Sequence, residues 1–296
     1  MEEKKHKAGF VNIIGNPNVG KSTLMNALVG ERLSIITSKA QTTRHRILGV
    51  VNDDDFQIVF SDTPGIIQPN YSLQTSMMKF VRSAFQDADV FLYMVEIGEK
   101  ALKDASFFER LKTTSVPILL LINKIDKSDQ GAVESSIEHW KEQLPLATII
   151  PVSALEGFNV DRVMEEIVAQ LPEADPYYPK DVLTDKPERF FVSEIVREKV
   201  LLNYQKEIPY SVEVVVEAFI EEDDIIRIGA IINVARETQK GIIIGHKGKA
   251  IKKVGTDARK DMETFFGKKV YLELFVKVLK NWRDNDQELK RFGYFT

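Results

Sequence analysis

Apolar residues in the first 171 positions form short continuous runs separated by segments of mixed polarity. The runs are AGFVNIIG from Ala8, FQIVFS from Phe56, VFLYMV from Val90, PILLLI from Pro117 and ATIIPV from Ala147. Such runs are typical of strands buried on both faces, and the amphipathic segments between them predict helices. The helices are expected from Lys21, up to Phe85, around Trp140 and from Asn159 to Leu171. This half should therefore be an α/β domain whose mostly parallel sheet has helices on both faces.

The pattern stops at residues 171–188, LPEADPYYPKDVLTDKPE, which contain four prolines and many charges without a period. This composition predicts a linker. Residues 1–171 would then form the first domain, residues 172–189 the linker and residues 190–296 a second domain.

The second half mixes helical and alternating patterns. A helix is expected over residues 191–205, strands over 210–220 and 225–235, a glycine turn, a helix over 250–266, a strand over 268–279 and a short helix near Gln287. The order αββαβ predicts an α+β domain with its own core.

The composition indicates the class of protein but not its function. The chain has 296 residues, of which 44% are hydrophobic and 28% charged, as in ordinary globular proteins. It contains no cysteine, which excludes disulfides and thiolate metal sites and fits a reducing compartment. Its longest apolar runs are far shorter than the roughly 20 residues of a membrane span, and the charged N-terminus has no apolar export signal. We expect a cytoplasmic protein.

The formal net charge of −4 hides an uneven distribution. Residues 1–189 hold 21 basic and 27 acidic side chains, whereas residues 190–296 hold 19 and 17. Between Arg236 and Lys280 the sequence has 12 basic against 5 acidic residues. Such a local excess is what a phosphate-binding surface requires.

The first glycine-framed turn is GNPNVGKST, which fits the pattern GxxxxGK[ST] between a predicted strand and a predicted helix. In this context the loop N–H groups face phosphate oxygens, Lys21 reaches the outer phosphates and Ser22 offers its hydroxyl to Mg²⁺. A turn that serves only strand–helix packing is the plain alternative. The residues expected to hold nucleotide are Gly15, Asn16, Asn18, Val19, Gly20, Lys21, Ser22 and Thr23.

Three motifs at later strand ends narrow the nucleotide to GTP. In DTPG, Asp62 would hold Mg²⁺ through water and the Gly65 amide would lie near the γ-phosphate. In NKID, the Asp126 carboxylate could accept two hydrogen bonds from guanine that adenine cannot offer. A backbone N–H of SAL could reach the guanine carbonyl, although SAL alone is as easily an ordinary loop. The expected residues are Asp62, Thr63, Pro64, Gly65, Asn123, Lys124, Asp126, Ser153, Ala154 and Leu155.

The segment SKAQTTRHRILG lies between the first glycine turn and DTPG. A mobile segment in this position could contact Mg²⁺ and γ-phosphate and be released after hydrolysis. Thr43 is the expected second metal ligand and Thr42 the alternative, while an exposed polar loop is the plain interpretation. The metal ligands are thus expected to be Ser22, Thr43 and Asp62, and the catalytic residues Lys21, Thr43 and Gly65.

The second glycine-framed turn lies in the basic region, where Gly245 and Gly248 enclose His246 and Lys247. A GxxG turn between an apolar strand end and a helix is the arrangement with which KH domains clamp about four single-stranded nucleotides. The plain alternative is a hairpin whose lysines are only solvated.

Apolar side chains at Ile243, Ile244, Ile251 and Val254 are expected to line a groove beside this turn. No aromatic residue falls between Gly241 and Lys260, so bases would meet aliphatic contacts rather than aromatic stacking. The residues expected to bind RNA are Ile244, Gly245, His246, Lys247, Gly248, Lys249, Ile251, Lys252 and Lys253.

With GNPNVGKST, TTRHRI, DTPG, NKID and SAL, the first half resembles the G domain of the translational GTPase superfamily. With NYQKEIPYS and IIIGHKGKAIKKVG added, essentially the whole chain resembles the Era family of bacterial GTPases. The resemblance implies a P-loop GTPase domain followed by a type II KH domain, with GTP or GDP and Mg²⁺ as ligands. It also implies a specific partner, the 3′ end of small-subunit rRNA, bound during maturation of the 30S ribosomal particle.

The chain departs from Ras-like GTPases after DTPG, where Ile66 and Ile67 replace the glutamine that orients the attacking water. The resemblance implies membership of the GTPases with a hydrophobic residue there, so intrinsic hydrolysis should be slow. Some of these use K⁺, held partly by the asparagine three residues before the P-loop lysine, here Asn18. A role of Asn18 in supporting the turn is the equal alternative. The chain is expected to be a monomer; peripheral association with the inner face of the cell membrane, credited to the family, has no supporting segment here.

Overall fold

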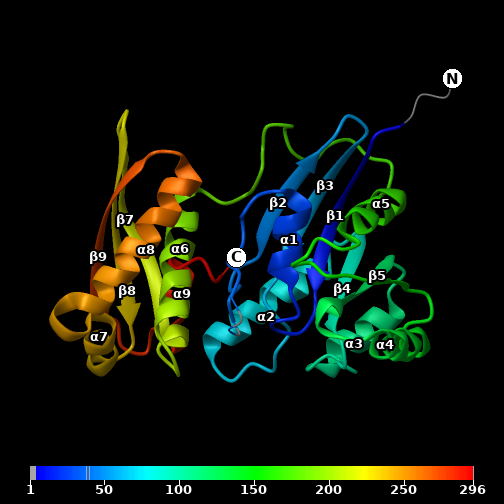
Figure 1. Ribbon diagram of the computed structural model, residues 1–296, viewed down its shortest axis with the longest axis horizontal. Helices are drawn as coiled ribbons and strands as arrows, with labels where there is room; N and C mark the ends of the chain where they lie inside the picture. Colours follow the sequence, from blue (N-terminus) through cyan, green and yellow to red (C-terminus); the bar gives the residue numbers. More distant parts are fainter. Residues whose placement is uncertain (1–4, 38, 40, 296) are drawn as a thin grey trace. The chain divides into compact units, whose positions relative to one another are not determined.

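The computed structural model describes residues 5–37, 39 and 41–295, which cluster into two compact units (Figure 1). Unit 1 comprises the described residues of Met1–Ser34, Thr43–Asn70 and Met77–Asp185, and unit 2 those of Ile35–Thr42, Tyr71–Ser76 and Lys186–Thr296. The expected fold class, an α/β GTPase domain followed by an α+β KH domain, is confirmed. Among the described residues, none of the helices has the length and apolar character needed to cross a membrane.

Unit 1 is built on a six-stranded sheet of order β2-β3-β1-β4-β5-β6. Its strands are β1 Lys7–Ile14, β2 Ile47–Asn52, β3 Phe56–Asp62, β4 Val90–Glu96, β5 Ile118–Asn123 and β6 Thr148–Pro151. All neighbours are parallel except β2 and β3, which form an antiparallel hairpin. The expected strands are present, and β2 was missed because its short run is interrupted by Gly49.

Helices cover both faces of this sheet. They are α1 Lys21–Val29, α2 Ser72–Ala84, α3 Ala105–Thr113, α4 Gln130–Gln143 and α5 Val160–Gln170. Tyr93 of β4 contacts Phe108 of α3 and Trp140 of α4, at ring-centroid distances of 6.4 and 5.4 Å, so these two helices share a face. Helices α1 and α5 contact each other, and right-handed crossovers put them on the opposite face. Helix α3 was not expected from the sequence.

Residues 172–185, expected to belong to a linker, pack along unit 1. The Ala8 N–H donates to the Pro172 carbonyl oxygen at 3.2 Å, and the Val50 N–H donates to the Leu183 carbonyl oxygen at 2.8 Å. The Gln57 amide donates to the Tyr178 carbonyl oxygen at 2.7 Å. The prolines prevent a periodic sequence pattern in this segment. Its carbonyl oxygens nevertheless accept hydrogen bonds from donor groups of unit 1.

Unit 2 has helices on one face of a three-stranded sheet (Figure 1). Its elements are α6 Glu188–Asn203, β7 Val212–Glu221, β8 Ile225–Val234, α7 Glu237–Ile244, α8 Lys249–Phe266, β9 Lys269–Val278 and α9 Asp286–Arg291. Strands β7 and β8 are antiparallel and β8 and β9 parallel. Valines of α6 and the apolar face of α8 pack on the strands in one buried cluster.

The order in unit 2 is αββααβ, because Ile242–Ile244 belong to helix α7 and not to a strand end as the sequence suggested. The Gln239 amide oxygen accepts from the Ala235 and Arg236 N–H groups at 2.9 and 3.1 Å, which begins the helix. The isoleucines of Ile242–Ile244 favour a strand by propensity. The capped start of the helix and the burial of Ile243 in the core outweigh this preference.

Two other segments complete unit 2. The buried Trp282 indole donates to the Ser211 carbonyl oxygen at 3.2 Å, so the C-terminal stretch docks on the domain. Residues 35–42 also cluster with unit 2, where the Arg197 guanidinium, 2.5 Å from Glu194, donates to the Thr42 carbonyl oxygen.

We expect Met262→Ala to destabilise unit 2 by about 2–5 kcal/mol, because the fully buried side chain leaves a cavity in the core. Urea unfolding of the full chain in a Trp140→Phe background, where Trp282 is the remaining tryptophan, reports on this unit. Lys260→Ala, at an exposed position of the same helix, is the control. Equal midpoints for both variants would contradict this account of the core.

Candidate functional site

The first glycine turn connects β1 to α1 and needs glycine at two positions. Gly15 and Gly20 have φ of 153° and 105°. A Cβ on Gly15 would lie 2.2 Å from the Met94 carbonyl oxygen, and one on Gly20 would lie 2.2 Å from Asn123 Nδ2. The loop is therefore packed against the ends of two other strands, which fixes its curvature.

The Lys21 ammonium is buried under this loop. It donates to the carbonyl oxygens of Gly15 at 3.2 Å and Asn16 at 2.8 Å. Burial lowers the pKa of Lys21 to about 8, although the charges of Asp62 and Glu99 oppose the shift. A cation held in this way is matched to an anionic ligand such as a phosphate chain.

Three oxygen ligands meet beside Lys21. The Ser22 hydroxyl donates to Asp62 Oδ2 at 2.7 Å, the Thr43 hydroxyl donates to the same oxygen at 3.2 Å, and the two hydroxyl oxygens are 2.9 Å apart. Asp62 Oδ1 is buried and accepts no hydrogen bond from the described residues, and burial raises the pKa of this carboxyl. Hard oxygen donors around an unsatisfied carboxylate oxygen fit Mg²⁺.

The structure distinguishes the two threonines. Thr43 lies in this group, whereas the Thr42 hydroxyl donates to the Lys39 carbonyl oxygen at 2.6 Å and lies 3.0 Å from the Thr37 hydroxyl. Ser38 and Ala40 of the same segment lie outside the described residues.

Asn123 joins the motifs expected to hold the base. Its side-chain amide donates to the Val19 carbonyl oxygen at 2.7 Å, and its oxygen accepts from the Ala154 N–H at 2.9 Å. The Ser153 hydroxyl donates to Asp126 Oδ1 at 2.6 Å. NKID and SAL, distant in sequence, are thus brought to one edge of the sheet with the first glycine turn.

DTPG closes against the same turn. A Cβ on Gly65 would lie 2.7 Å from backbone atoms of Pro17, and the Ile66 N–H donates to the Gly15 carbonyl oxygen at 3.0 Å. The Thr63 hydroxyl is satisfied by the Ile13 carbonyl oxygen at 2.7 Å. The Ile66 side chain is apolar and fully buried, so it cannot form a hydrogen bond to a water molecule.

Peripheral positions differ in exposure. Pro64 is buried, as are Asp62 and Thr63, whereas Gly65 is half-buried and Leu155 of SAL is 69% exposed. Asn18 is exposed and has a left-handed backbone with φ of 67°, a conformation that asparagine tolerates well. Lys124 also has positive φ, 67°, and its ammonium pairs with Glu96 at 2.7 Å.

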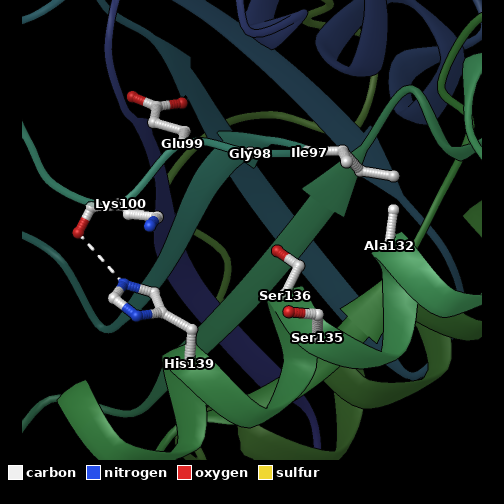
Figure 2. Close-up of a pocket in the computed structure, with 8 residues that line it drawn as sticks. All are labelled: Ile97, Gly98, Glu99, Lys100, Ala132, Ser135, Ser136 and His139. Atoms are coloured by element: carbon white, nitrogen blue, oxygen red, sulfur yellow. Dashed lines mark hydrogen bonds between the residues drawn. The ribbon is translucent and has the colours of Figure 1, made fainter.

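Two glutamates of this region were missed by the sequence analysis. Glu96 ends β4, and Glu99 lies three residues later in the loop shown in Figure 2. Glu99 accepts a hydrogen bond from the Asn16 side chain, while its second oxygen accepts from the Glu96 N–H at 3.0 Å. Their place after a buried strand was a usable signal, because the carboxyl ends of parallel strands share one edge.

The second glycine turn lies in unit 2 between α7 and α8. Gly245, Lys247 and Gly248 have positive φ of 69°, 50° and 75°, and a Cβ on Gly245 would lie 2.6 Å from the Ala250 Cβ. His246 and Lys247 are exposed at the tip. The turn thus presents its backbone and its cations to solvent.

The residues around this turn only partly match the expected groove. Ile243 and Val254 are fully buried in the core and cannot line a surface groove, so that expectation was wrong for both. Ile244 and Ile251 are half-buried, and Ile242, which was not expected, is 49% exposed. Because these residues lie on helix α7, Ile243 points into the core and Ile242 points to the surface.

Four lysines expected to bind RNA lie at the tip or after it. Lys249, Lys252 and Lys253 are exposed on α8, as is Lys247 before them. The Lys253 ammonium also pairs with Asp257 at 2.6 Å, a surface ion pair that a phosphate could readily displace.

Comparisons with known proteins agree with both units. Residues 10–124 match a family model described as a 50S ribosome-binding GTPase, and residues 207–283 match the KH domain model. The chain is 44% identical to GTPase Era of Staphylococcus haemolyticus, with 98% of each protein covered. It is 46% identical to GTPase Era of Geotalea uraniireducens over 99% of this chain and 100% of the relative.

Solved structures give the same result. The chain superimposes with a TM-score of 0.93, at 40% identity, on Era in complex with MgGDPNP and nucleotides 1506–1542 of 16S ribosomal RNA, covering 98% of this chain and 99% of the other. A variant of Aquifex aeolicus Era bound to GDP and AlF4⁻ matches with a TM-score of 0.93 and 41% identity, covering 97% and 99%.

We expect Thr43→Val to raise the Mg²⁺ concentration for half-maximal GTP hydrolysis by roughly tenfold or more, because one oxygen donor is lost. Thr42→Val is the matched control, since that hydroxyl bonds within its own segment. A magnesium titration of hydrolysis compares the two variants. The assignment is wrong if Thr42→Val alone shifts the requirement.

Proposed function

Since this chain belongs to the Era family of GTPases, we propose that it is a GTP-driven switch that binds the single-stranded 3′ end of small-subunit rRNA and acts in maturation of the small ribosomal subunit. One observation carries the proposal: a closed GTP-type site and an exposed basic GxxG turn occur in one chain. The solved Era complex, which holds MgGDPNP and a 16S rRNA segment, supports the pairing of these ligands.

At the nucleotide site, each residue has a distinct task. Ser22, Thr43 and Asp62 would hold Mg²⁺, which when bound neutralises charge on the phosphates. Lys21 would exchange the carbonyl oxygens that it now contacts for phosphate oxygens, and the Asp126 carboxylate would select guanine. The Gly65 N–H would reach the γ-phosphate, as in other switches of this class.

Hydrolysis requires that water be positioned without a glutamine. Ile66 is buried and cannot donate or accept through its side chain, so the intrinsic rate should be slow. Asn18 at the exposed edge of the first glycine turn supports a further proposal, that a bound K⁺ beside the phosphates supplies positive charge.

At the RNA site, the glycines remove side-chain bulk and the lysines supply charge. Phosphates of the RNA would approach the turn Gly245–Gly248, and unpaired bases would lie on Ile242, Ile244 and Ile251. We propose that the RNA is single-stranded, because an exposed glycine turn suits contact with the backbone of single-stranded nucleotides and not recognition of bases in a duplex groove.

Coupling between nucleotide and RNA is part of the same proposal. Thr43 is grouped with the metal ligands, while the preceding residue Thr42 accepts from Arg197 within unit 2. A nucleotide that moves this segment would therefore alter contacts of α6. Such a ligand shifts the balance between two states only by the difference of its affinities for them. We place this activity in the cytoplasm, on a monomer.

We expect hydrolysis to be several-fold faster in K⁺ than in Na⁺ at equal ionic strength, because in this proposal K⁺ rather than Na⁺ supplies the positive charge near Asn18. An Asn18→Asp control keeps an oxygen ligand and should retain the preference, whereas Asn18→Ala should lose it. Steady-state phosphate release measures the rates. Equal rates of the unaltered chain in both salts would exclude the K⁺ proposal.

We expect tighter binding of a labelled single-stranded RNA matching the 3′ end of small-subunit rRNA with a non-hydrolysable GTP analogue than with GDP. Salt is fixed and a scrambled RNA competes, because lysines bind any phosphate backbone at low salt. Gly248→Asp should remove RNA binding and leave GTP hydrolysis intact, since it adds bulk and negative charge at a positive φ. Equal binding in both nucleotide states would refute the coupling, and unchanged binding by Gly248→Asp would refute the RNA site.

A further inference from the structure

The side chain of Asn16, the second residue of the first glycine turn, is held entirely by the loop that follows β4. Its amide donates to a Glu99 carboxylate oxygen and to the Ala101 carbonyl oxygen, the latter at 3.0 Å. Its oxygen accepts from the Lys103 N–H at 2.9 Å. Glu99 is the charged member of this set, and charged acceptors form the stronger hydrogen bonds.

The main chain of Asn16 is engaged on the other side. Its carbonyl oxygen accepts from the Lys21 ammonium at 2.8 Å. The Glu99 carboxylate also acts on Lys21 through its charge, which favours the ammonium form. A short path therefore connects Glu99, through Asn16, to the lysine that would bind the phosphates.

We propose that Glu99 is a positioning residue of the GTPase reaction, whose half-buried carboxylate holds Asn16 and so keeps the phosphate-binding loop in its binding shape. The inference rests on the proposed function, since it concerns the same nucleotide site. Glu99 itself touches neither nucleotide nor metal in this account. Its effect reaches the phosphates through the conformation of the loop and the placement of Lys21.

A cavity of about 300 Å³ gives experimental access to Glu99. Glu99 forms part of one wall, and Ala132, Ser135, Ser136 and His139 of α4 form the opposite wall. Figure 2 shows the carboxylate directed away from the serines of α4. The buried Ser136 hydroxyl has no hydrogen-bond partner among the described residues, so the cavity is a place where small polar molecules can enter.

Removal of the carboxylate would extend this cavity toward Asn16. Formate carries the same two oxygens as the lost group and is small enough to diffuse into the space left by Glu99→Ala. Restored function with formate would show that the carboxylate is needed for its hydrogen bonds, because packing alone is not restored by a mobile ion.

The loop should bind phosphates equally in the ground state and the transition state, and a loss of such uniform binding raises KM without lowering kcat. For Glu99→Ala we expect the KM for GTP to rise about tenfold, as for loss of one charged hydrogen bond in a network, with kcat changed less than about twofold. Formate should return KM toward the original value, compared with chloride at equal ionic strength.

Two further variants of the full chain complete the experiment. Glu99→Gln keeps an oxygen for Asn16 but turns an amide toward the Glu96 N–H, so its KM should fall between those of the unaltered chain and Glu99→Ala. Ser136→Ala alters the opposite wall of the same cavity without touching Asn16, and its KM should be unchanged with or without formate.

The inference is overturned if Glu99→Ala and Glu99→Gln both retain the original KM, or if formate acts equally on the Ser136→Ala control. A fall in kcat alone, with KM unchanged, would also overturn it. Failure of the unaltered chain to hydrolyse GTP would instead refute the proposed function, so the two failures are distinguishable.

Discussion

The Lys21 ammonium lies inside unit 1, where it has lost its hydration, and the surrounding backbone has to compensate for that loss. The carbonyl oxygens of Gly15 and Asn16 do so directly, and the buried carboxylate of Asp62 and the half-buried carboxylate of Glu99 contribute charge. Because Asp62 ends β3 and the other groups lie in the loops after β1 and β4, the position of one cation depends on several strand ends at this edge of the sheet. A phosphate chain can replace the carbonyl contacts without moving the surrounding strands.

The loops at this edge are tied to each other before any ligand arrives. Asn123 connects NKID to both the first glycine turn and SAL, and Asn16 connects that turn to the loop after β4. Groups that are already in place lose little conformational entropy when nucleotide binds. Preorganisation of this kind also concentrates charge stabilisation where a triphosphate carries its charge.

Both units contain a glycine turn of a kind suited to phosphates, but in opposite settings. The first turn is packed closely against DTPG and strand ends, so it suits a small ligand with a metal ion. The second is exposed at the end of α7, with its lysines in solvent, so it suits a long chain that continues past it. Burial, rather than the glycine pattern, distinguishes a nucleotide pocket from a polymer-binding surface.

The sequence by itself determined the two fold classes, the nucleotide motifs and the basic GxxG turn, because each rests on local spacing. Strand periodicity, turn glycines and charge density are properties of neighbouring residues, and they survive without knowledge of the fold. Only the tertiary structure decided what depends on contacts across the chain. It placed Thr43 rather than Thr42 at Asp62, put Ile242–Ile244 in a helix, and buried Ile243 and Val254.

The same reason explains why Glu99 escaped the sequence analysis. Its partner Asn16 lies 83 residues away, and no motif relates the two positions. Packing against other elements chooses between local alternatives of similar energy, and a hydrogen bond between distant residues exists only once the sheet brings their strands together. Local sequence patterns therefore predicted the classes of ligand, whereas the contacts between strand ends determined which side chains lie together at the candidate site.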